Sequence, residues 1–484
     1  MATSTNIKTI QDIMRQDAGV DGDAQRISQL VWMIFLKVFD DKEKEWELED
    51  TSYKSAVPEK YRWRNWASNK EGITGDELLD FISEMFKTLK SLNMSKIDDP
   101  RGFIVWEVFE DAYNYMKSGT LIRQVINKLN EIDFNKSEDK HLFNEVYEKI
   151  LSDLQSAGNA GEYYTPRAVT QFIVDIVNPK LGEKVLDPAC GTGGFLVSTL
   201  ENMKKQITSD ADLEKLQNNI NGVEKKPLPH LLCTTNMILH GIEVPNIRHD
   251  NTLARPLADY GASDMVDVVV TNPPFGGIEE PGIEMNFPSV YRTRETADLF
   301  LVLIMKLLRG DGRCGMVLPD GFLFGEGAKT RIKEKLLSEF NLHTIVRLPN
   351  GVFNPYTGIK TNLLFFEKNK PTKEIWYFEH PFPEGYKIYN KTKPIQIEEF
   401  NLEKDWWNNR QDEKFSKYCW KISIADIQNR NYNLDITNPN NTNDETELSK
   451  EYIIEKIEET INRTYELLKL IKGEGQNETS RIQS

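Results

Sequence analysis

The sequence predicts an α/β protein with three parts: an N-terminal α-helical domain, a doubly wound and mostly parallel sheet, and a helix near the C-terminus. Three features of the 484 residues predict it. Apolar residues recur at helical spacing up to about residue 155. Beyond residue 160, short apolar segments alternate with helical ones. Near the end, apolar residues step by three and four.

The N-terminal domain, residues 1–155, is predicted to be helical. Its clearest helix is DAQRISQLVWMIFLKVFDDKEKEWE, in which the apolar side chains fall on one face. Those side chains are Ile27, Leu30, Val31, Ile34, Phe35 and Val38. Residues 76–92, 120–132 and 141–154 repeat the pattern, with Pro, Gly and charged clusters between them.

The doubly wound sheet is predicted for residues 156–370. Its expected strands are EKVLDPACG, INGVE, VPNIRHD, VDVVVTN, GRCGMVLP, HTIVRLP and TNLLFFEK. Helical segments lie among them, at residues 168–177, 228–240, 297–308 and 327–340. Strands that alternate with helices form parallel sheets, and ligands of such sheets bind outside the carboxyl ends of the strands. The residues that follow the strands are therefore the candidate site residues.

The chain beyond residue 370 is less regular. Residues 371–445 are rich in aromatic residues and Pro, and the sequence leaves their structure open. Residues 446–472 form a predicted helix with a seam made of Ile454, Ile457, Ile461, Thr464, Leu468 and Ile471. Such a seam either packs on its own domain or docks onto a partner subunit. Residues 473–484 are predicted to be disordered.

Composition limits the possible functions. The formal charge of −15 disfavours tight DNA binding by this chain alone, because such proteins usually carry a basic face, but DNA stays possible as a substrate. The four cysteines form no CxxC pair, which indicates a reducing compartment and no zinc site. No apolar run is long enough to cross a membrane and no leader opens the chain, so we expect a cytoplasmic protein.

The segment VLDPACGTGGFL, residues 185–196, is the first candidate site. A strand ends at Asp187, and Gly191, Gly193 and Gly194 then permit a tight turn before a helix. The spacing is not that of the dinucleotide fingerprint. It fits either an ordinary glycine-rich turn or a nucleoside pocket. In a pocket, the backbone would approach the ligand and Asp187 would face a cationic group.

Two further acids follow the next two predicted strands. Glu224 ends INGVE, where a carboxylate can accept hydrogen bonds from both ribose hydroxyls. Asp250 ends NIRHD, where a carboxylate can accept from an adenine amino group. A solvated strand-end acid is the alternative for each one. Three acids closing three successive strands favour a nucleoside site.

The fourth predicted strand stops at TNPPF. Pro273 and Pro274 stiffen the backbone and donate no hydrogen bond, so the carbonyls here are free acceptors. Asn272 adds an amide oxygen, and Phe275 is expected as an exposed aromatic face for stacking. An isolated Asn-Pro-Pro is usually a plain turn. Beside a nucleoside pocket, this turn predicts hydrogen bonds to a planar amino group.

DPACGTGGF followed by NPPF resembles the N6-adenine DNA methyltransferases, which use S-adenosylmethionine. Over nearly its full length the chain is similar to the modification (methyltransferase) subunit of type I restriction-modification systems. GEYYTPRAV at residues 161–169, FNPYTGIKTNLLFFEK at 353–368 and NRNYNLDITNP at 429–439 add to the likeness. The motif order matches the gamma class of these enzymes, which implies a Rossmann-like methyltransferase sheet.

The resemblance implies a role for each motif. Asn272, Pro273, Pro274 and Phe275 would hold a flipped target adenine, with hydrogen bonds from its N6 to the Asn272 side chain and the Pro273 carbonyl. Glu224 would bind the ribose of the cofactor and Asp250 its adenine, although RHDNTL lacks the Gly that the family often has before this Asp. The other residues expected to hold S-adenosylmethionine are Glu162, Tyr163, Tyr164, Thr165, Pro166, Arg167, Asp187, Gly191, Thr192, Gly193, Gly194 and Phe195.

The resemblance also implies partners. Type I modification subunits act on double-stranded DNA with a separate specificity subunit, two modification subunits to one, and restriction subunits join for cleavage. We expect the helix at 446–472 to dock onto the specificity subunit. Three alternatives stay open: a solitary adenine-N6 methyltransferase that reads DNA through residues 371–440, a protein glutamine methyltransferase, and a non-catalytic scaffold.

Overall fold

A computed structural model describes residues 2–92, 95–132, 165–354, 357–390 and 392–440. The chain divides into two units, Met1–Thr437 and Asn438–Ser484, and the fold below is that of the first. The predicted helices at 141–154 and 446–472, the tail at 473–484 and the site residues Glu162, Tyr163 and Tyr164 lie outside the described residues.

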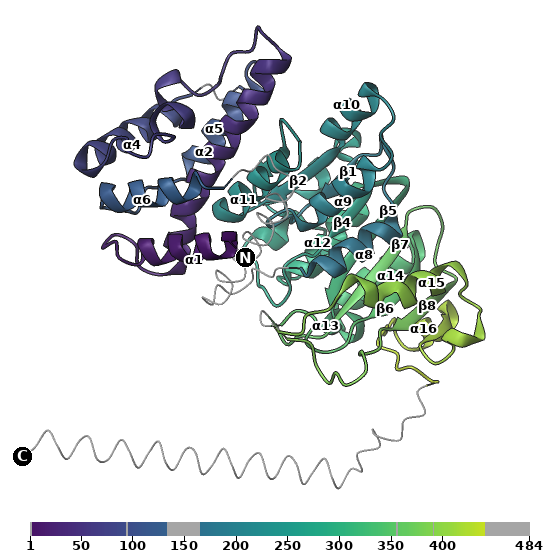
Figure 1. The fold of residues 1–484 in the computed structure, drawn as a ribbon. Coiled ribbons are helices and arrows are strands. Elements are labelled where there is room, and N and C mark those ends of the chain that lie inside the picture. The colour runs from purple at the N-terminus through teal and green to yellow at the C-terminus, as the bar shows by residue number, and fades with distance from the viewer. Residues whose placement is uncertain (1, 93–94, 133–164, 355–356, 391, 441–484) are drawn as a thin grey trace, which may run out of the picture. The chain divides into compact units, whose positions relative to one another are not determined.

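The N-terminal region is helical, as predicted (Figure 1). Its described helices are α1 (Ala2–Met14), α2 (Asp23–Glu49), α3 (Trp63–Trp66), α4 (Gly75–Leu89), α5 (Pro100–Glu110) and α6 (Gly119–Leu129). Asp99 caps α5 ahead of Pro100, and Ser118 caps α6. The core is rich in aromatic residues: the Trp32 ring lies edge-on to Phe86, with the ring centroids 5.1 Å apart.

The helical region packs against one helix of the sheet region, α11 (Pro227–Leu239). Leu231, Leu232, Ile238 and Leu239 of α11 join the helical core. Cys233 and Met237, on the same helix, join the core of the sheet. Because α11 contributes to both cores, it links the helical region to the strands that precede and follow it.

The sheet has nine described strands in the order β3-β2-β1-β4-β5-β7-β6-β8-β9. Their bounds are β1 (Val185–Asp187), β2 (Ile220–Glu224), β3 (Asn246–His249), β4 (Val266–Thr271), β5 (Leu308–Pro319), β6 (Asn341–Arg347), β7 (Thr361–Glu367), β8 (Glu374–Glu379) and β9 (Cys419–Ser423). β3, β2, β1, β4 and β5 pair in parallel, as do β6 and β8, whereas β7 and β9 run antiparallel to their neighbours. The predicted mostly parallel α/β fold is confirmed.

The strand order reverses at β1. From β1 the chain runs outward through β2 to β3, and then returns to place β4 on the other side of β1. Asp187 is paired with Gly222 of β2, and Leu186 with Val269 of β4. Such a reversal leaves a crevice at the carboxyl ends of the strands, where ligands bind. The DPACG and NPPF motifs follow β1 and β4, the two strands that flank this point.

The described helices of the sheet region are α8 (Arg167–Val177), α9 (Gly194–Lys204), α10 (Asp210–Asn219), α11, α12 (Thr296–Leu307), α13 (Asp320–Phe324), α14 (Ala328–Glu339), α15 (Asn401–Asn408) and α16 (Ile424–Asn429). The helices α8, α11, α12 and α14 lie within one residue of the four predicted ranges at each end, and α9 follows the glycine-rich turn as expected, whereas α10, α13, α15 and α16 were not predicted. α8 packs against α9, and α12 packs against α14.

Residues 371–440, which the sequence left open, extend the sheet. β8 and β9 form its far edge, where the Tyr377 and Trp420 rings stack with centroids 5.2 Å apart. The buried His380 Nδ1 contacts Glu403 Oε1 of α15 at 2.5 Å. Across the part of the chain that the structure describes, we found no helix long and apolar enough for a membrane span.

Candidate active site

Asp187 ends β1 as a buried acid with 1% of its surface exposed. Its Oδ1 accepts a hydrogen bond from the Thr271 hydroxyl at 2.6 Å and another from the Ala189 amide at 3.1 Å. Burial raises the pKa of Asp187 to about 7, although both hydrogen bonds oppose the rise. Among the described residues, nothing hydrogen-bonds its Oδ2, so this oxygen is left for a ligand.

The glycine-rich loop after Asp187 requires glycine at Gly193. This residue has φ 86°, and a Cβ on it would lie 2.8 Å from Cys233 Sγ. The Gly193 amide donates to the Cys190 carbonyl, and the Thr192 carbonyl accepts from Asn236 Nδ2 at 3.2 Å. The loop therefore lies tightly against α11, with bare backbone on its surface.

Glu224, at the end of β2, holds the same loop. Its Oε2 accepts from the Gly191 amide at 2.9 Å and its Oε1 from the Lys226 amide at 2.7 Å. The structure thus brings Glu224 and the glycine loop together. The Asp250 carboxylate instead extends into solvent beside Arg248, 3.5 Å from its Nε, although the Asp250 amide donates to the Glu224 carbonyl.

Asn272 follows the last residue of β4. Its Nδ2 donates a hydrogen bond to Thr165 Oγ1 at 2.9 Å. This bond joins the NPPF motif to the GEYYTP segment, of which the structure describes Thr165 and Pro166. Its Oδ1 is buried and has no hydrogen-bond partner among the residues described. A buried acceptor without a partner is costly, so a ligand with an N–H group would stabilise this position.

The expectation of an exposed Phe275 is wrong, because the ring is fully buried. It packs edge-on against Phe353, with centroids 6.0 Å apart and planes at 84°. Gly276, with φ 74°, turns the chain outward directly afterwards. A base can reach the Phe275 ring only after neighbouring side chains move.

The remaining predicted cofactor residues separate into two groups. Thr165, Pro166 and Gly194 are partly exposed. Phe195 is buried in the sheet core, and the Arg167 guanidinium lies 3.1 Å from Glu201 on α9. These two contacts stabilise packing, so a direct part in cofactor binding stays a prediction for both.

Three residues of the site were not predicted from the sequence. Thr271 supports Asp187, Asn236 holds the Thr192 carbonyl, and Cys233 lies 3.8 Å from Cys190, sulfur to sulfur. Thr271 precedes NPPF and was detectable as a hydroxyl at a strand end. Asn236 and Cys233 lie on α11, whose local pattern shows only a helix.

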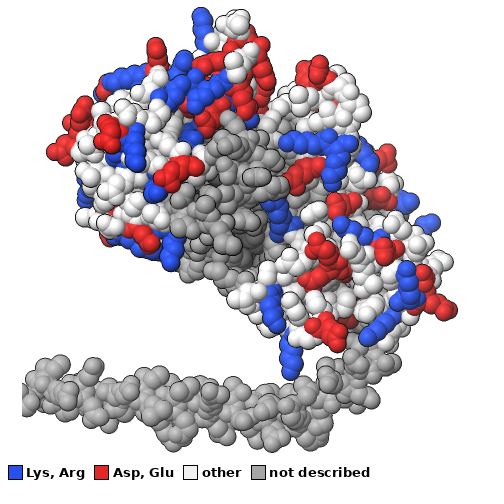
Figure 2. All heavy atoms as spheres, viewed as in Figure 1, with Lys and Arg blue, Asp and Glu red and all other residues white. Residues whose placement is uncertain are grey.

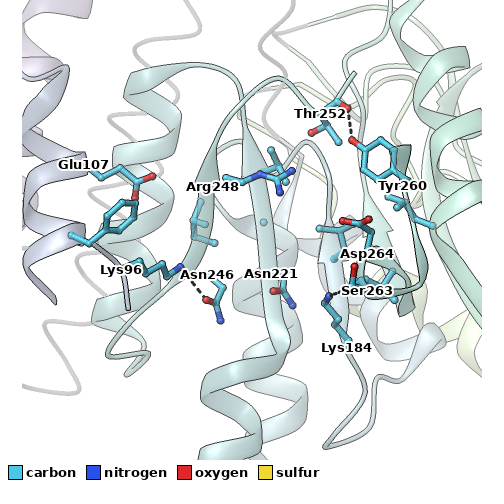
Figure 3. Close-up of a pocket in the computed structure, with 17 residues that line it drawn as sticks. Lys96, Glu107, Lys184, Asn221, Asn246, Arg248, Thr252, Tyr260, Ser263 and Asp264 are labelled. Carbon is cyan, nitrogen blue, oxygen red and sulfur yellow. Dashed lines mark hydrogen bonds between the residues drawn. The ribbon is translucent and has the colours of Figure 1, made fainter. Parts of the chain in front are cut away.

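A second pocket, of about 370 Å³, lies beside the predicted cofactor site (Figure 3). Lys96 and Glu107 of the helical region form one wall, and Arg248 of β3 projects between them and the opposite wall. Leu186 and Val223 line the pocket, whereas Asp187 and Glu224, which follow them, do not. Neither of these two acids, both predicted to hold the cofactor, therefore lines this pocket.

Two family models match the chain. Residues 138–448 match the N-6 DNA methylase family, and residues 3–129 match the HsdM N-terminal domain. The EcoEI methylase subunit of a type I restriction enzyme from Escherichia coli is 61% identical over 91% of both chains. The EcoKI methylase subunit from Escherichia coli strain K12 is 30% identical and covers 73% of this chain and 66% of its own length.

Solved structures agree with the sequence relatives. A modification subunit from Vibrio vulnificus YJ016 superposes with a TM-score of 0.82 at 44% identity, and covers 90% of this chain and 96% of its own. A chain from a study of assembly and conformational transition in the type I restriction-modification system has a TM-score of 0.79 at 38% identity, over 98% and 99%. The chain therefore belongs to the N-6 DNA methylases and, within them, to the methylase subunits of type I restriction-modification systems.

Proposed function

We propose that this chain transfers a methyl group from S-adenosylmethionine to N6 of an adenine flipped out of duplex DNA. The observation that carries this proposal is the buried Asn272 Oδ1, which lacks a hydrogen-bond partner among the described residues. It lies one residue beyond Thr271, whose hydroxyl contacts Asp187. An unsatisfied acceptor beside a glycine loop suits an exocyclic amine brought next to a nucleoside cofactor.

The residues at the switch point fit S-adenosylmethionine. Asp187 keeps Oδ2 for the cationic amino end of the cofactor, and the bare backbone at Gly191 suits close approach, whereas Gly193 is buried against Cys233. The Glu224 carboxylate holds the loop through the Gly191 amide, where ribose hydroxyls would reach it. Asp250 is proposed for the adenine ring. When bound, the cofactor supplies an electrophilic methyl group.

The chain would act on the adenine mainly by orientation and electrostatics. Asn272 Oδ1 and the Pro273 carbonyl would accept hydrogen bonds from N6–H. These bonds would draw the nitrogen lone pair, otherwise delocalised into the ring, toward the amine. In the structure, the hydrogen bond from Asn272 Nδ2 to Thr165 leaves Oδ1 as the amide atom that would face the substrate. Phe275 and Phe353 are both buried, and they would line this pocket only after neighbouring side chains move.

We propose that sequence recognition comes from a separate specificity subunit bound by two copies of this chain, with restriction subunits added for cleavage. The charge of −15 supports this division, since DNA binding needs positive charge. On the face shown in Figure 2, charges of both signs are interspersed over the described residues. Residues 446–472 remain the proposed docking helix. The four free thiols are consistent with a cytoplasmic location.

A methyl-transfer assay tests the proposed function. The chain would be purified with and without its specificity subunit, and tritium transfer from labelled S-adenosylmethionine into plasmid DNA would be measured, followed by identification of N6-methyladenine. We expect transfer only with the specificity subunit. Labelled protein without labelled DNA would instead support the glutamine methyltransferase alternative. Transfer to DNA without the partner would support a solitary enzyme.

Substitution of Asn272 tests the proposed site. Asn272→Ala is expected to lower the methyl-transfer rate by about 100-fold or more, since removing one preorganised hydrogen-bonding group has effects of that size. Its affinity for S-adenosylmethionine, measured by calorimetry, should stay near wild type. Asn341→Ala is the matched control, because Asn341 donates its amide to Glu367 at the amino edge of the sheet. Near-wild-type transfer by Asn272→Ala would remove the mechanism.

A further inference from the structure

Residues 276–295, between NPPF and α12, form a segment that is firmly held at its base. The Gly277 carbonyl accepts from the amide and the hydroxyl of Thr296, at 3.3 and 3.1 Å. The Glu279 amide donates to the Arg294 carbonyl at 2.9 Å, and Ile278 and Glu295 form an antiparallel bridge. The two ends of the segment thus form a short hairpin directly after the catalytic motif.

The rest of the segment follows the carboxyl edge of the sheet. Lys225, which follows β2, lies 3.5 Å from Glu279 and 3.0 Å from Glu280. The Asn286 amide donates to the carbonyls of Leu253 and Ala254, beyond β3, at 3.0 and 2.9 Å. These contacts hold the segment beside the proposed cofactor and adenine positions.

The segment exposes large apolar side chains. Ile278 is 70% exposed, Met285 60% and Val290 48%. Single exposed apolar residues are ordinary, but several on one fixed segment beside a site indicate a binding surface. Ile278 is the most exposed of the three and the nearest to NPPF. It is also β-branched, and therefore stiff at χ1.

We propose that Ile278 enters the DNA base stack at the position that the target adenine leaves. This inference rests on the proposed function. Ile278 is three residues from Phe275, so its Cα lies within about 10 Å of that residue along the chain. Flipping a base costs a few kcal/mol in lost stacking, and an apolar side chain between bases recovers part of it. The hairpin base holds Ile278 in place.

The charges around Ile278 are mixed. Lys225 pairs with Glu279 and Glu280, the acids nearest to Ile278 in sequence. Residues 276–295 carry four acids and two cations, Arg292 and Arg294, which are both exposed. Phosphate contacts of this segment would therefore fall to Arg292 and Arg294.

The test compares two DNA duplexes that differ in one position. Both contain the recognised site, but one has thymine opposite the target adenine and the other has an abasic site, so that the adenine leaves the stack without breaking a pair. Single-turnover methyl transfer would be measured with the complete methylase and saturating S-adenosylmethionine. We expect Ile278→Ala to be about ten-fold slower than wild type on the thymine duplex, and within about two-fold of it on the abasic duplex.

Three further variants make the outcome specific. Ile278→Leu keeps the apolar volume and should stay close to wild type on both duplexes. Phe324→Ala removes another exposed apolar side chain, 52% exposed at the end of α13, and should not distinguish the duplexes. Ile97→Ala does the same in the helical region, where Ile97 is 93% exposed.

Several outcomes would overturn the inference. These are an equal loss on both duplexes for Ile278→Ala, no loss on either, or duplex selectivity in Phe324→Ala instead. If the wild-type methylase transfers no methyl group to either duplex, the proposed function fails and not the role of Ile278. Unchanged thermal unfolding and S-adenosylmethionine affinity in Ile278→Ala would establish that a rate loss does not come from misfolding.

Discussion

Two buried aspartates, one in each region of the molecule, have different surroundings. Asp17, in the helical region, accepts backbone hydrogen bonds on both oxygens: from Gly19 and Lys117 on Oδ1, and from Lys117 and Ser118 on Oδ2. Asp187, at the carboxyl end of β1, accepts two hydrogen bonds, both on Oδ1. Both carboxylate oxygens of Asp17 are hydrogen-bonded within the fold, whereas one oxygen of Asp187 accepts no hydrogen bond from the described residues.

The difference separates these two residues, although the helical region also contains buried side-chain atoms without a described hydrogen-bond partner, such as Trp32 Nε1 and Glu43 Oε2. Buried polar groups in a scaffold are matched by the chain itself, because an unmatched group destabilises the fold. At a ligand site the matching group arrives with the ligand. Among the described residues, Asn272 Oδ1 is buried without a hydrogen-bond partner and Asp187 is hydrogen-bonded only through Oδ1, and these residues stand at the carboxyl ends of the neighbouring strands β4 and β1.

The largest effect is expected for Asp187→Asn. Without the carboxylate the affinity for S-adenosylmethionine should fall by about 100-fold, the size of a lost charge-assisted hydrogen bond. The free energy of unfolding of this variant should instead rise at neutral and higher pH. The folded state holds a proton on Asp187 that the unfolded chain releases, so the wild type loses stability as the pH rises from 3.8 to about 7.

The Asn variant avoids this loss. At pH 8 we expect its free energy of unfolding to exceed that of the wild type by on the order of 2 kcal/mol, measured by urea denaturation. Calorimetry on the same preparation would give the cofactor affinity. Unchanged affinity would show that Asp187 is another structural acid.

Asp17→Asn should show the converse. The amide keeps one acceptor oxygen and faces backbone N–H groups with its NH2, so the free energy of unfolding should fall by about 2 kcal/mol. Affinity for S-adenosylmethionine should not change in the folded fraction. Urea denaturation measures the change in stability and calorimetry the cofactor affinity. A loss of cofactor affinity equal to that of Asp187→Asn would show that the two aspartates do not differ in their role.

The pH dependence of cofactor binding should follow Asp187. Since its pKa is about 7 and the cationic end of the cofactor favours the carboxylate, affinity should fall as the pH drops below 7. The limiting slope is about ten-fold per pH unit. Titration calorimetry from pH 8 to pH 6 would measure it, with Asp187→Asn as a control that lacks the dependence. If the wild-type affinity did not change with pH, the cationic end of the cofactor would be bound by another group.

The smallest effect is expected for Thr271→Val. The substitution keeps the shape of the side chain but removes the hydroxyl that lowers the pKa of Asp187. The midpoint of the pH profile should therefore shift upward, and the affinity at pH 7 should fall by about three- to ten-fold. An unchanged midpoint would show that the bond between the two motifs does not affect cofactor binding.

The sequence predicted the strands and helices that carry the site because their apolar patterns are local. It also placed Asp187, Glu224 and Asn272 at strand ends, which a parallel sheet brings to one edge. Two features depend on partners distant in sequence and were not predictable: Phe353 packs against Phe275, and α11 contributes to two cores. β8 and β9 were missed because their segments, EIWYFE and CWKIS, are short.

The most direct test is a structure of the methylase complex with its DNA and a non-transferring analogue of S-adenosylmethionine. We predict that the target adenine lies outside the duplex, with N6 about 2.7–3.2 Å from Asn272 Oδ1, the oxygen that now lacks a partner among the described residues. A flipped adenine whose N6 bonds to another group, or an Asn272 Oδ1 that stays without a donor, would contradict the account.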